Sequence, residues 1–160
     1  MSEIILIAAI AQTSGVIGDR GNLPWSIPED LKRFRQLTLN HTVIMGRKTW
    51  EFDLQKRPLA QRTNVIVSSQ SLQSDQPNVE FVRSLSEAFD RSDEKLFVIG
   101  GAMIYEQAID FAGKMELTWV EGDFQGDVIF PVKRDRILET FESTNVEERT
   151  GFRFETFRRK

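Results

Sequence analysis

Short runs of apolar residues alternate with amphipathic segments through the first two thirds of the chain. Runs of about four to eight apolar residues are typical of strands that are buried on both faces of a parallel sheet. Strands of this kind are predicted at residues 4–11, 42–45, 63–67, 79–82 and 96–99. Short helices between them would complete βαβ units, so the pattern predicts an α/β fold built on a parallel sheet.

Helix-start signals fall between the predicted strands. Ser26 and Ser84 are each followed three residues later by a glutamate, Glu29 and Glu87, which is the pattern of a capping box. Pro28 suits the first turn of a helix, where its missing N–H costs nothing. Helices are therefore expected from residues 28, 47 and 84 onward and across residues 102–109.

The last third of the chain has a different pattern. Strands are predicted at residues 115–120, 139–146 and 152–157, with no helix between the last two. Arg149-Thr150-Gly151 predicts a hairpin connection. Antiparallel strands are common at one edge of a parallel sheet, so the expected fold is a mostly parallel sheet with an antiparallel C-terminal hairpin strand.

Two polar segments are expected to be loops. Gly15, Gly18, Gly21 and Pro24 interrupt a long connection before the first helix. A loop of that size is either a functional lid or a long surface connection, and the two readings are equally supported. Residues 68–77 are polar throughout and are expected to be solvated.

Composition and charge narrow the class of protein. The 160 residues suffice for one domain with a sizeable core, expected to span residues 1–160. The net charge of −3 gives no bulk affinity for nucleic acid, and no apolar run is long enough to span a bilayer. A chain without cysteine and with one histidine, His41, offers no disulfide, thiolate site, histidine-based metal cluster or serine triad. A cytoplasmic monomer that binds neither nucleic acid, membrane nor metal is expected.

Asp30 is the first candidate for chemistry. On the helix expected from residue 28, Asp30, Phe34 and Leu37 share the face that should turn inward. A carboxylate there has two readings. It belongs to the exposed first turn, where acids suit the helix dipole, or it lines a pocket and binds a ligand with donor groups.

Two strand–glycine–helix units form the second candidate site. Met45-Gly46-Arg47-Lys48-Thr49 and Ile99-Gly100-Gly101-Ala102-Met103 each end a strand in glycine and open a helix. Helix N-termini present free N–H groups to phosphates, and parallel strands end at one edge of their sheet. The two units therefore predict one pyrophosphate held from two sides, although neither is the usual GxGxxG fingerprint.

Several arginines are candidates for anion binding. Arg47, Ser69 and Arg83 follow three predicted strands and are placed to converge on a further phosphate, which would favour a 2′-phosphorylated nicotinamide dinucleotide. Taken alone, each arginine is more typical of a solvated surface charge. Arg57 and Arg62 surround a rigid kink and are candidates for clamping a substrate carboxylate.

Short motifs with one order and approximate spacing extend over almost the whole chain. They are Ile17-Gly18, Leu23-Pro24-Trp25, Pro28-Glu29-Asp30-Leu31, Val43-Ile44-Met45-Gly46-Arg47-Lys48-Thr49, Arg57-Pro58-Leu59, Val98-Ile99-Gly100-Gly101, Ile104-Tyr105, Gly126-Asp127 and Phe130-Pro131. Each piece is common, but the set is specific. Together the motifs resemble bacterial dihydrofolate reductase.

The resemblance implies an eight-stranded mixed sheet with four helices, NADPH as hydride donor and 7,8-dihydrofolate as acceptor. Asp30 resembles the carboxylate that holds the 2-amino group and N3 of the pterin, and Thr118 resembles the strand threonine that supports it. Arg62 matches the arginine for the α-carboxylate of the glutamate tail, with Arg57 nearer the rim. The apolar pterin and benzoyl walls match Ile7, Ala8, Leu31, Phe34, Leu59 and Ile99.

The resemblance also implies a cofactor side. Gly100 and Gly101 resemble a pair that is joined by a cis peptide in this family. The adenosine-phosphate side matches Arg47, Lys48, Thr49, Ser68, Ser69 and Arg83. The nicotinamide side and the lid match Ala9, Val16, Ile17, Gly18 and Asn22. The helix after the glycines adds Ala102, Met103, Ile104, Tyr105 and Gln107.

The sequence departs from the family pattern at four places. Leu23 stands where methionine is frequent, residues 51–56 form a longer connection without its glycine, and Ala60-Gln61 replaces the common Pro-Gly. Val128 stands where threonine is frequent. The first three departures lie near the expected substrate mouth and concern affinity and inhibitor sensitivity more than chemistry.

The implied reaction is hydride transfer to C6 of the pterin with protonation of N5, which supplies tetrahydrofolate for one-carbon metabolism and makes the protein an antifolate target. Asp30 is expected to raise the basicity of N5, while water admitted near Leu23 and Trp25 delivers the proton. One alternative is a reductase of the same fold for a pyrimidine or riboflavin precursor, which has no need for Asp30 with Arg62. The other is a dinucleotide-binding sensor without catalysis.

Overall fold

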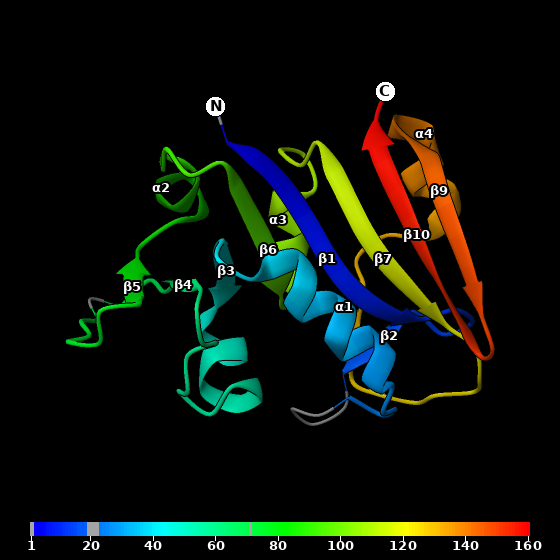
Figure 1. Cartoon of the computed structure of the whole chain (residues 1–160), viewed down its shortest axis with the longest axis horizontal. Helices are drawn as coiled ribbons and strands as arrows, with labels where there is room; N and C mark the ends of the chain where they lie inside the picture. The colour runs from blue at the N-terminus through cyan, green and yellow to red at the C-terminus, as the bar shows by residue number, and fades with distance from the viewer. Residues whose placement is uncertain (1, 19–22, 71) are drawn as a thin grey trace.

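One eight-stranded sheet forms the centre of the computed structural model, which describes residues 2–18, 23–70 and 72–160. The strand order is β5-β4-β3-β6-β1-β7-β10-β9 (Figure 1). The strands are β1 (Glu3–Ala11), β3 (Thr42–Gly46), β4 (Thr63–Val67), β5 (Val79–Val82), β6 (Lys95–Gly100), β7 (Lys114–Val120), β9 (Phe141–Arg149) and β10 (Phe152–Arg159). All neighbours from β5 to β7 are parallel, and β10 runs antiparallel between β7 and β9. The predicted fold class is confirmed.

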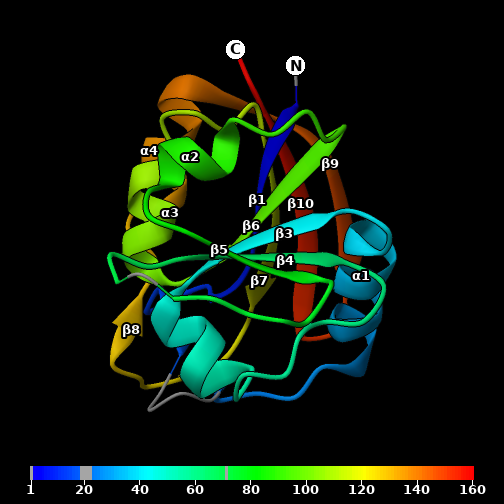
Figure 2. The ribbon, with the colours of Figure 1, turned by 90° about the vertical axis from the view of Figure 1, so that its left-hand side faces the viewer.

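Helices cover both faces of the sheet (Figure 2). The helices are α1 (Pro28–Thr38), the π-helix η1 (Thr49–Asp53), α2 (Leu85–Phe89), α3 (Ala102–Ala108) and α4 (Arg134–Thr140). Because strand side chains alternate between faces, Leu6 and Ile10 pack with α2, α3 and α4, whereas Ile5 and Ile7 pack with Trp50 and the α1 face. Within the described residues, no helix is long and apolar enough to cross a bilayer.

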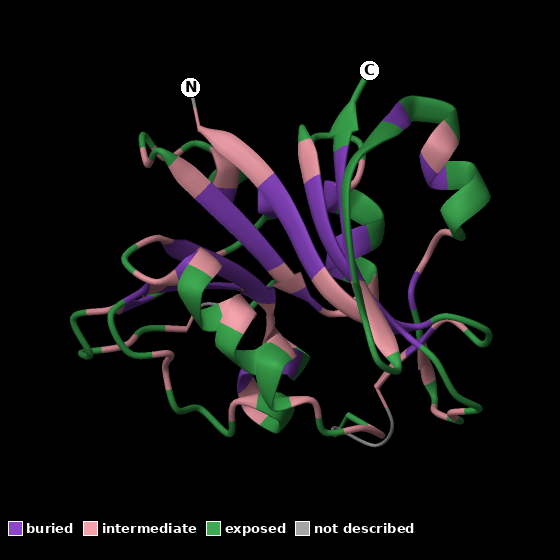
Figure 3. Cartoon of the chain, turned by 45° about the vertical axis from the view of Figure 1, so that its right-hand side comes forward, coloured by how far each residue is buried: buried purple, intermediate pink, exposed green. Residues whose placement is uncertain are grey.

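The buried residues lie mainly on the central strands of the sheet (Figure 3). Leu6, Val43, Ile44 and Val98 are fully buried, whereas β9 is exposed along almost its whole length at the edge. One buried carboxylate holds this edge. Glu155 accepts hydrogen bonds from Trp119, Arg134 and Ser143 at 2.7–2.9 Å. Burial raises the pKa of Glu155, but these donors outweigh it and leave the pKa below its usual range.

One predicted strand has the wrong start, and some short elements were not predicted. The strand expected at residues 139–146 begins only at Phe141, because the last residues of α4 occupy its first two positions. The N-cap of α4, Lys133, makes no side-chain capping bond, so this helix lacks the capping residue that would have marked its start. The antiparallel pair β2 (Val16–Gly18) and β8 (Val128–Ile129) was not predicted, because such short strands depend on a partner far along the chain.

The two predicted capping boxes have different outcomes. The first is wrong: α1 has Ile27 as its N-cap, with no side-chain capping bond and Pro28 in its first turn. The second is confirmed in part. Ser84 Oγ accepts a hydrogen bond from the Glu87 N–H at 3.1 Å, but the Glu87 carboxylate accepts from Arg83 N–H instead.

Gly126 packs tightly against β2 and gives a test of this small second sheet. A Cβ at Gly126 would lie 2.3 Å from Gly18 O and 2.6 Å from Val16 Cγ1. Gly126→Ala should therefore lower the free energy of unfolding by about 1–3 kcal/mol in urea titrations. Gly113→Ala is the matched control, because nothing lies within 4 Å of its added Cβ. Equal stabilities of the two variants would contradict the close packing.

Candidate active site

A cavity of about 600 Å³ opens between α1, η1 and the carboxyl-terminal parts of β1 and β6. Its volume lies in the usual range of small-molecule sites. Its lining residues are Ile7, Ala8, Ala9, Ile17, Gly18, Leu23, Asp30, Leu31, Arg33, Phe34, Arg35, Thr49, Asp53, Leu54, Leu59, Arg62, Ile99, Gly100, Gly101, Tyr105, Thr118 and Val128. The helix expected around Asp30 and the two glycine units therefore border one cavity.

Asp30 is half-buried in this cavity and is held by β7. Thr118 Oγ1 donates a hydrogen bond to Asp30 Oδ1 at 2.6 Å. Burial raises the pKa of Asp30, although the hydrogen bond from Thr118 and the nearby charge of Arg33 both lower it. Of the two readings of Asp30, the geometry supports the pocket carboxylate.

The predicted apolar walls all line the cavity. This set comprises Ile7, Ala8, Leu31, Phe34, Leu59 and Ile99. Leu31 is the most open member, with 57% of its surface exposed at the mouth. A flat apolar ligand could therefore stack between α1 and β1 with its polar edge turned toward Asp30.

The two candidate tail arginines lie in different environments. Arg62 lines the cavity and is buried, and it donates hydrogen bonds from Nη1 to Thr38 Oγ1 at 3.1 Å and from Nε to Ala60 O at 3.0 Å. Burial and then the nearby charge of Arg35 lower the pKa of Arg62. Arg57 is exposed, lies outside the cavity lining and donates to Gln55 Oε1.

The predicted glycine pair forms part of the opposite wall. The peptide bond between Gly100 and Gly101 is cis. A Cβ on either glycine would fill space within 3.6 Å of Thr49 Oγ1. Tyr105 lines the same wall and donates a hydrogen bond to Ile7 O at 2.8 Å. Burial, together with the negative charge of Asp53, raises the pKa of Tyr105.

Of the predicted phosphate-side residues, Thr49 lines the cavity, whereas the others lie at the same edge of the sheet but outside the cavity lining. Arg47, Ser68 and Arg83 directly follow β3, β4 and β5, whose last residues pair with one another. Arg83 Nη2 donates to Ser69 O at 3.3 Å, and Arg47 pairs with Glu51 at 3.3 Å. The remaining predicted residues outside the lining are Val16, Lys48, Ala102, Met103, Ile104 and Gln107. Of these, Lys48, Met103 and Gln107 are exposed.

The predicted lid residues do not all line the cavity. Leu23 lines the cavity, whereas Trp25 lies outside its lining and packs edge-on against Phe124 at 5.1 Å between ring centroids. The buried Trp25 Nε1 has no hydrogen-bond partner among the described residues. Asn22 lies outside the described residues.

Several lining residues were missed by sequence reasoning. They are Arg33, Arg35, Asp53, Leu54 and Val128. Asp53 stands one helical turn after Thr49 and hydrogen-bonds to it, and burial raises the pKa of Asp53. The four-residue spacing from Thr49 was the available signal for Asp53, and the three-residue spacing from Asp30 was the signal for Arg33.

The sequence departs from the family pattern near the cavity mouth, at residues 51–56 and at Ala60-Gln61, and the backbone of these segments has uncommon φ values. The longer connection at residues 51–56 ends η1 and then turns at Gln55 and Lys56, which have φ values of 53° and 59°. Gln61 also has a positive φ, 59°. Such values are uncommon for residues other than glycine, so these positions accept a conformational cost of about 1 kcal/mol each.

Comparisons with known proteins agree with this geometry. A family model described as dihydrofolate reductase matches residues 3–159. A dihydrofolate reductase of Buchnera aphidicola is 41% identical over 81% of this chain and 79% of its own, and one of Mycobacterium tuberculosis is 37% identical over 98% and 97%. A dihydrofolate reductase of Enterococcus faecalis, solved with NADP(H) and RAB-propyl, superimposes with a TM-score of 0.85 at 28% identity. That superposition covers 99% of this chain and 96% of the other.

Proposed function

The chain belongs to the dihydrofolate reductase family, and we propose that its Asp30 cavity converts 7,8-dihydrofolate to 5,6,7,8-tetrahydrofolate for one-carbon metabolism. NADPH is the cofactor of this enzyme. The observation that carries the proposal is the half-buried Asp30 carboxylate, fixed by Thr118 inside a cavity that also contains Gly100 and Gly101. We further propose that residues 1–160 act as one domain and as a cytoplasmic monomer.

The cavity wall beyond Asp30 fits a dinucleotide. Ala9, Gly18, Gly100 and Gly101 line this wall with small side chains or none, and added Cβ atoms at the last two would fill the space beside Thr49. These residues would hold the nicotinamide end, while Arg47, Ser69 and Arg83 at the same sheet edge would bind phosphates. When bound, NADPH supplies the hydride that reduces C6 of the pterin.

Asp30 has the acceptor capacity to orient the pterin. A carboxylate offers about four lone-pair positions, and Thr118 uses one of them on Oδ1. The remaining positions would accept hydrogen bonds from the 2-amino group and N3. Phe34 and Leu59 would enclose the rings, and Arg62 would bind a carboxylate of the glutamate tail. Among the described residues assigned to the pterin, none is placed to donate directly to N5.

Protonation of N5 is therefore assigned to water. Ionised Asp30 would raise the basicity of N5 through its field, which acts strongly in a partly buried site. Leu23 lines the entrance, and the Trp25 N–H, which has no partner within the described residues, would donate to a bound water molecule. Asp30 thus acts electrostatically, and the proton comes from the solvent side.

The reaction is tested by following NADPH absorbance in the presence and absence of dihydrofolate. We expect oxidation of NADPH only when dihydrofolate is present, with tetrahydrofolate as the product. Stable absorbance with both present would favour the dinucleotide-binding sensor. Consumption with a pyrimidine or riboflavin precursor instead of dihydrofolate would favour the related reductase.

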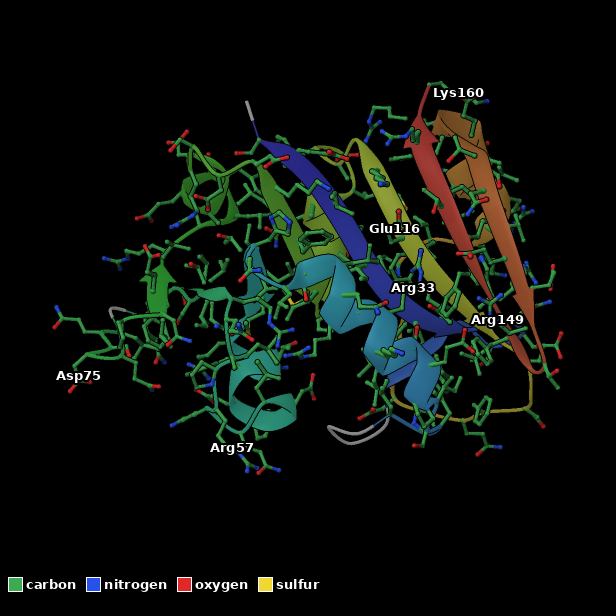
Figure 4. The ribbon with its side chains drawn as sticks, viewed as in Figure 1. Arg33, Arg57, Asp75, Glu116, Arg149 and Lys160 are labelled. Carbon is green, nitrogen blue, oxygen red and sulfur yellow. The ribbon has the colours of Figure 1, made fainter. Side chains whose placement is uncertain are left out.

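Asp30→Asn should lower the rate of hydride transfer by about 10²–10⁴-fold, because the variant loses the charge that supports N5. NADPH affinity, measured by fluorescence titration, should stay unchanged. Asp75→Asn is the matched control, because Asp75 is exposed at the far end of the sheet from α1 (Figure 4). Equal losses of hydride transfer and NADPH binding would place Asp30 outside the pterin site.

The pH dependence of the chemical step has a definite sign. Burial raises the pKa of Asp30, and below that pKa the protonated carboxyl group no longer supports N5. Once Asp30 is ionised, further increase in pH only lowers the protonated fraction of N5, which must take a proton as hydride reaches C6. The rate of hydride transfer in single-turnover experiments should fall as the pH rises through the neutral range. A profile that stays flat there would contradict electrostatic support of N5 protonation by Asp30.

A further inference from the structure

A second polar contact joins α1 to β7, one helical turn along from Asp30. Arg33 Nη2 donates a hydrogen bond to Glu116 Oε2 at 2.5 Å, and the two residues form an ion pair (Figure 4). Arg33 follows Asp30 by three residues on the helix, and Glu116 precedes Thr118 by two residues on the strand. Both spacings keep side chains on one face, so Asp30–Thr118 and Arg33–Glu116 are consecutive contacts across one interface.

Glu116 is a buried carboxylate, with 4% of its surface exposed. Besides Arg33, it accepts a hydrogen bond from Thr156 Oγ1 at 2.9 Å and pairs with Lys114 Nζ at 3.2 Å. A buried charge is costly unless it is paired and hydrogen-bonded, and here three groups satisfy it. The orientation of Glu116 is therefore fixed, and so is the position of the guanidinium that it holds.

Arg33 also faces the active-site cavity. It lines the cavity together with Asp30, and its guanidinium lies 4.5 Å above the ring centre of Phe154. Arg33 thus stands between two carboxylates, Glu116 in direct contact and Asp30 within electrostatic range. Because both carboxylates interact with the same cation, a change in the charge of one carboxylate changes the electrostatic potential at the other.

We propose that Glu116 is a positioning residue that acts through Arg33 and sets the positive potential at Asp30. Glu116 offsets the Arg33 charge and keeps the guanidinium against β7 instead of beside the Asp30 carboxylate. The inference rests on the proposed function, because it concerns the same carboxylate. It extends the catalytic site to a residue outside the cavity lining.

The other charged groups around Asp30 lie either on the solvent side of α1 or elsewhere on the cavity wall. On the exposed side of α1, Glu29 pairs with Arg149 of β9 at 2.6 Å, and Arg149 lies 3.9 Å from Glu147. Solvent screens those charges. On the neighbouring strand β10, Phe154 and Thr156 are the uncharged side chains that face Arg33 and Glu116. The remaining charged residues of the cavity wall are Arg35, Arg62 and Asp53.

The test compares two charge-removing variants of the same ion pair. Glu116→Gln leaves the Arg33 charge without its offset, so the potential at the pterin site becomes more positive and protonation of N5 is disfavoured. The falling limb of the rate–pH profile should then move to lower pH by roughly half a unit. Arg33→Gln removes the cation, so the limb should move to higher pH by a similar amount. A merely structural contact would lower the melting temperature in both variants without shifts of opposite sign.

Conservative and matched variants complete the set. Arg33→Lys keeps the positive charge and should restore a profile near that of the unmodified enzyme. The Arg33→Gln/Glu116→Gln double variant removes both charges and leaves no buried carboxylate without its partner. It replaces Arg33→Gln in the comparison with Glu116→Gln if Arg33→Gln fails to fold. Glu139→Gln removes an exposed carboxylate from the Arg136 pair on α4 and should shift nothing.

A second readout separates this inference from the proposed function. The ¹³C resonance of the Asp30 carboxyl group, titrated in the full-length enzyme without substrate, should move in opposite directions in Glu116→Gln and Arg33→Gln. Unchanged titration, or shifts of the same sign, would overturn the role of Glu116. Opposite carboxyl shifts with an unmoved rate profile would support the role of Glu116 and overturn the catalytic role of Asp30.

Discussion

The packing of α1 against β7 through Asp30 and Thr118 is the contact on which the rest of the site depends. It holds a carboxylate partly out of water, where a charge is costly and therefore responsive to every neighbour. The helix supplies the acid and the apolar wall from one face. The strand supplies the hydroxyl and, two residues earlier, the buried Glu116. A shift of the helix by a fraction of a turn would move the acid and the apolar wall together, away from their partners on the strand.

Much of the fold could be predicted because it depends on local patterns. The apolar runs that became β1, β3, β4, β5 and β6 end within one or two residues of their predicted limits. Gly100 and Gly101 lie where β6 ends and α3 begins. Where local patterns are silent, prediction failed: α4 has no capping residue, and β2 with β8 exists only as a pairing of distant segments.

Some residues of the candidate site could be predicted from the sequence, and others could not. Periodicity alone pointed Asp30 and Phe34 inward, because both lie on the apolar stripe of a helix. No periodicity could reveal that Glu116 meets Arg33, since the meeting depends on how α1 crosses the sheet. The same reason explains Arg57, which lies close in sequence to Arg62 but turns toward Gln55 and solvent.

The buried guanidinium of Arg62 has a consequence for molecular recognition. Two of its donors are already committed to Thr38 and Ala60, so the planar group is held still before any ligand arrives. Immobilising a long flexible side chain on binding ordinarily costs about 0.5–1.5 kcal/mol, and here folding has already met that cost. A carboxylate arriving at this wall meets a rigid fork, so its affinity should depend sharply on the angle of approach.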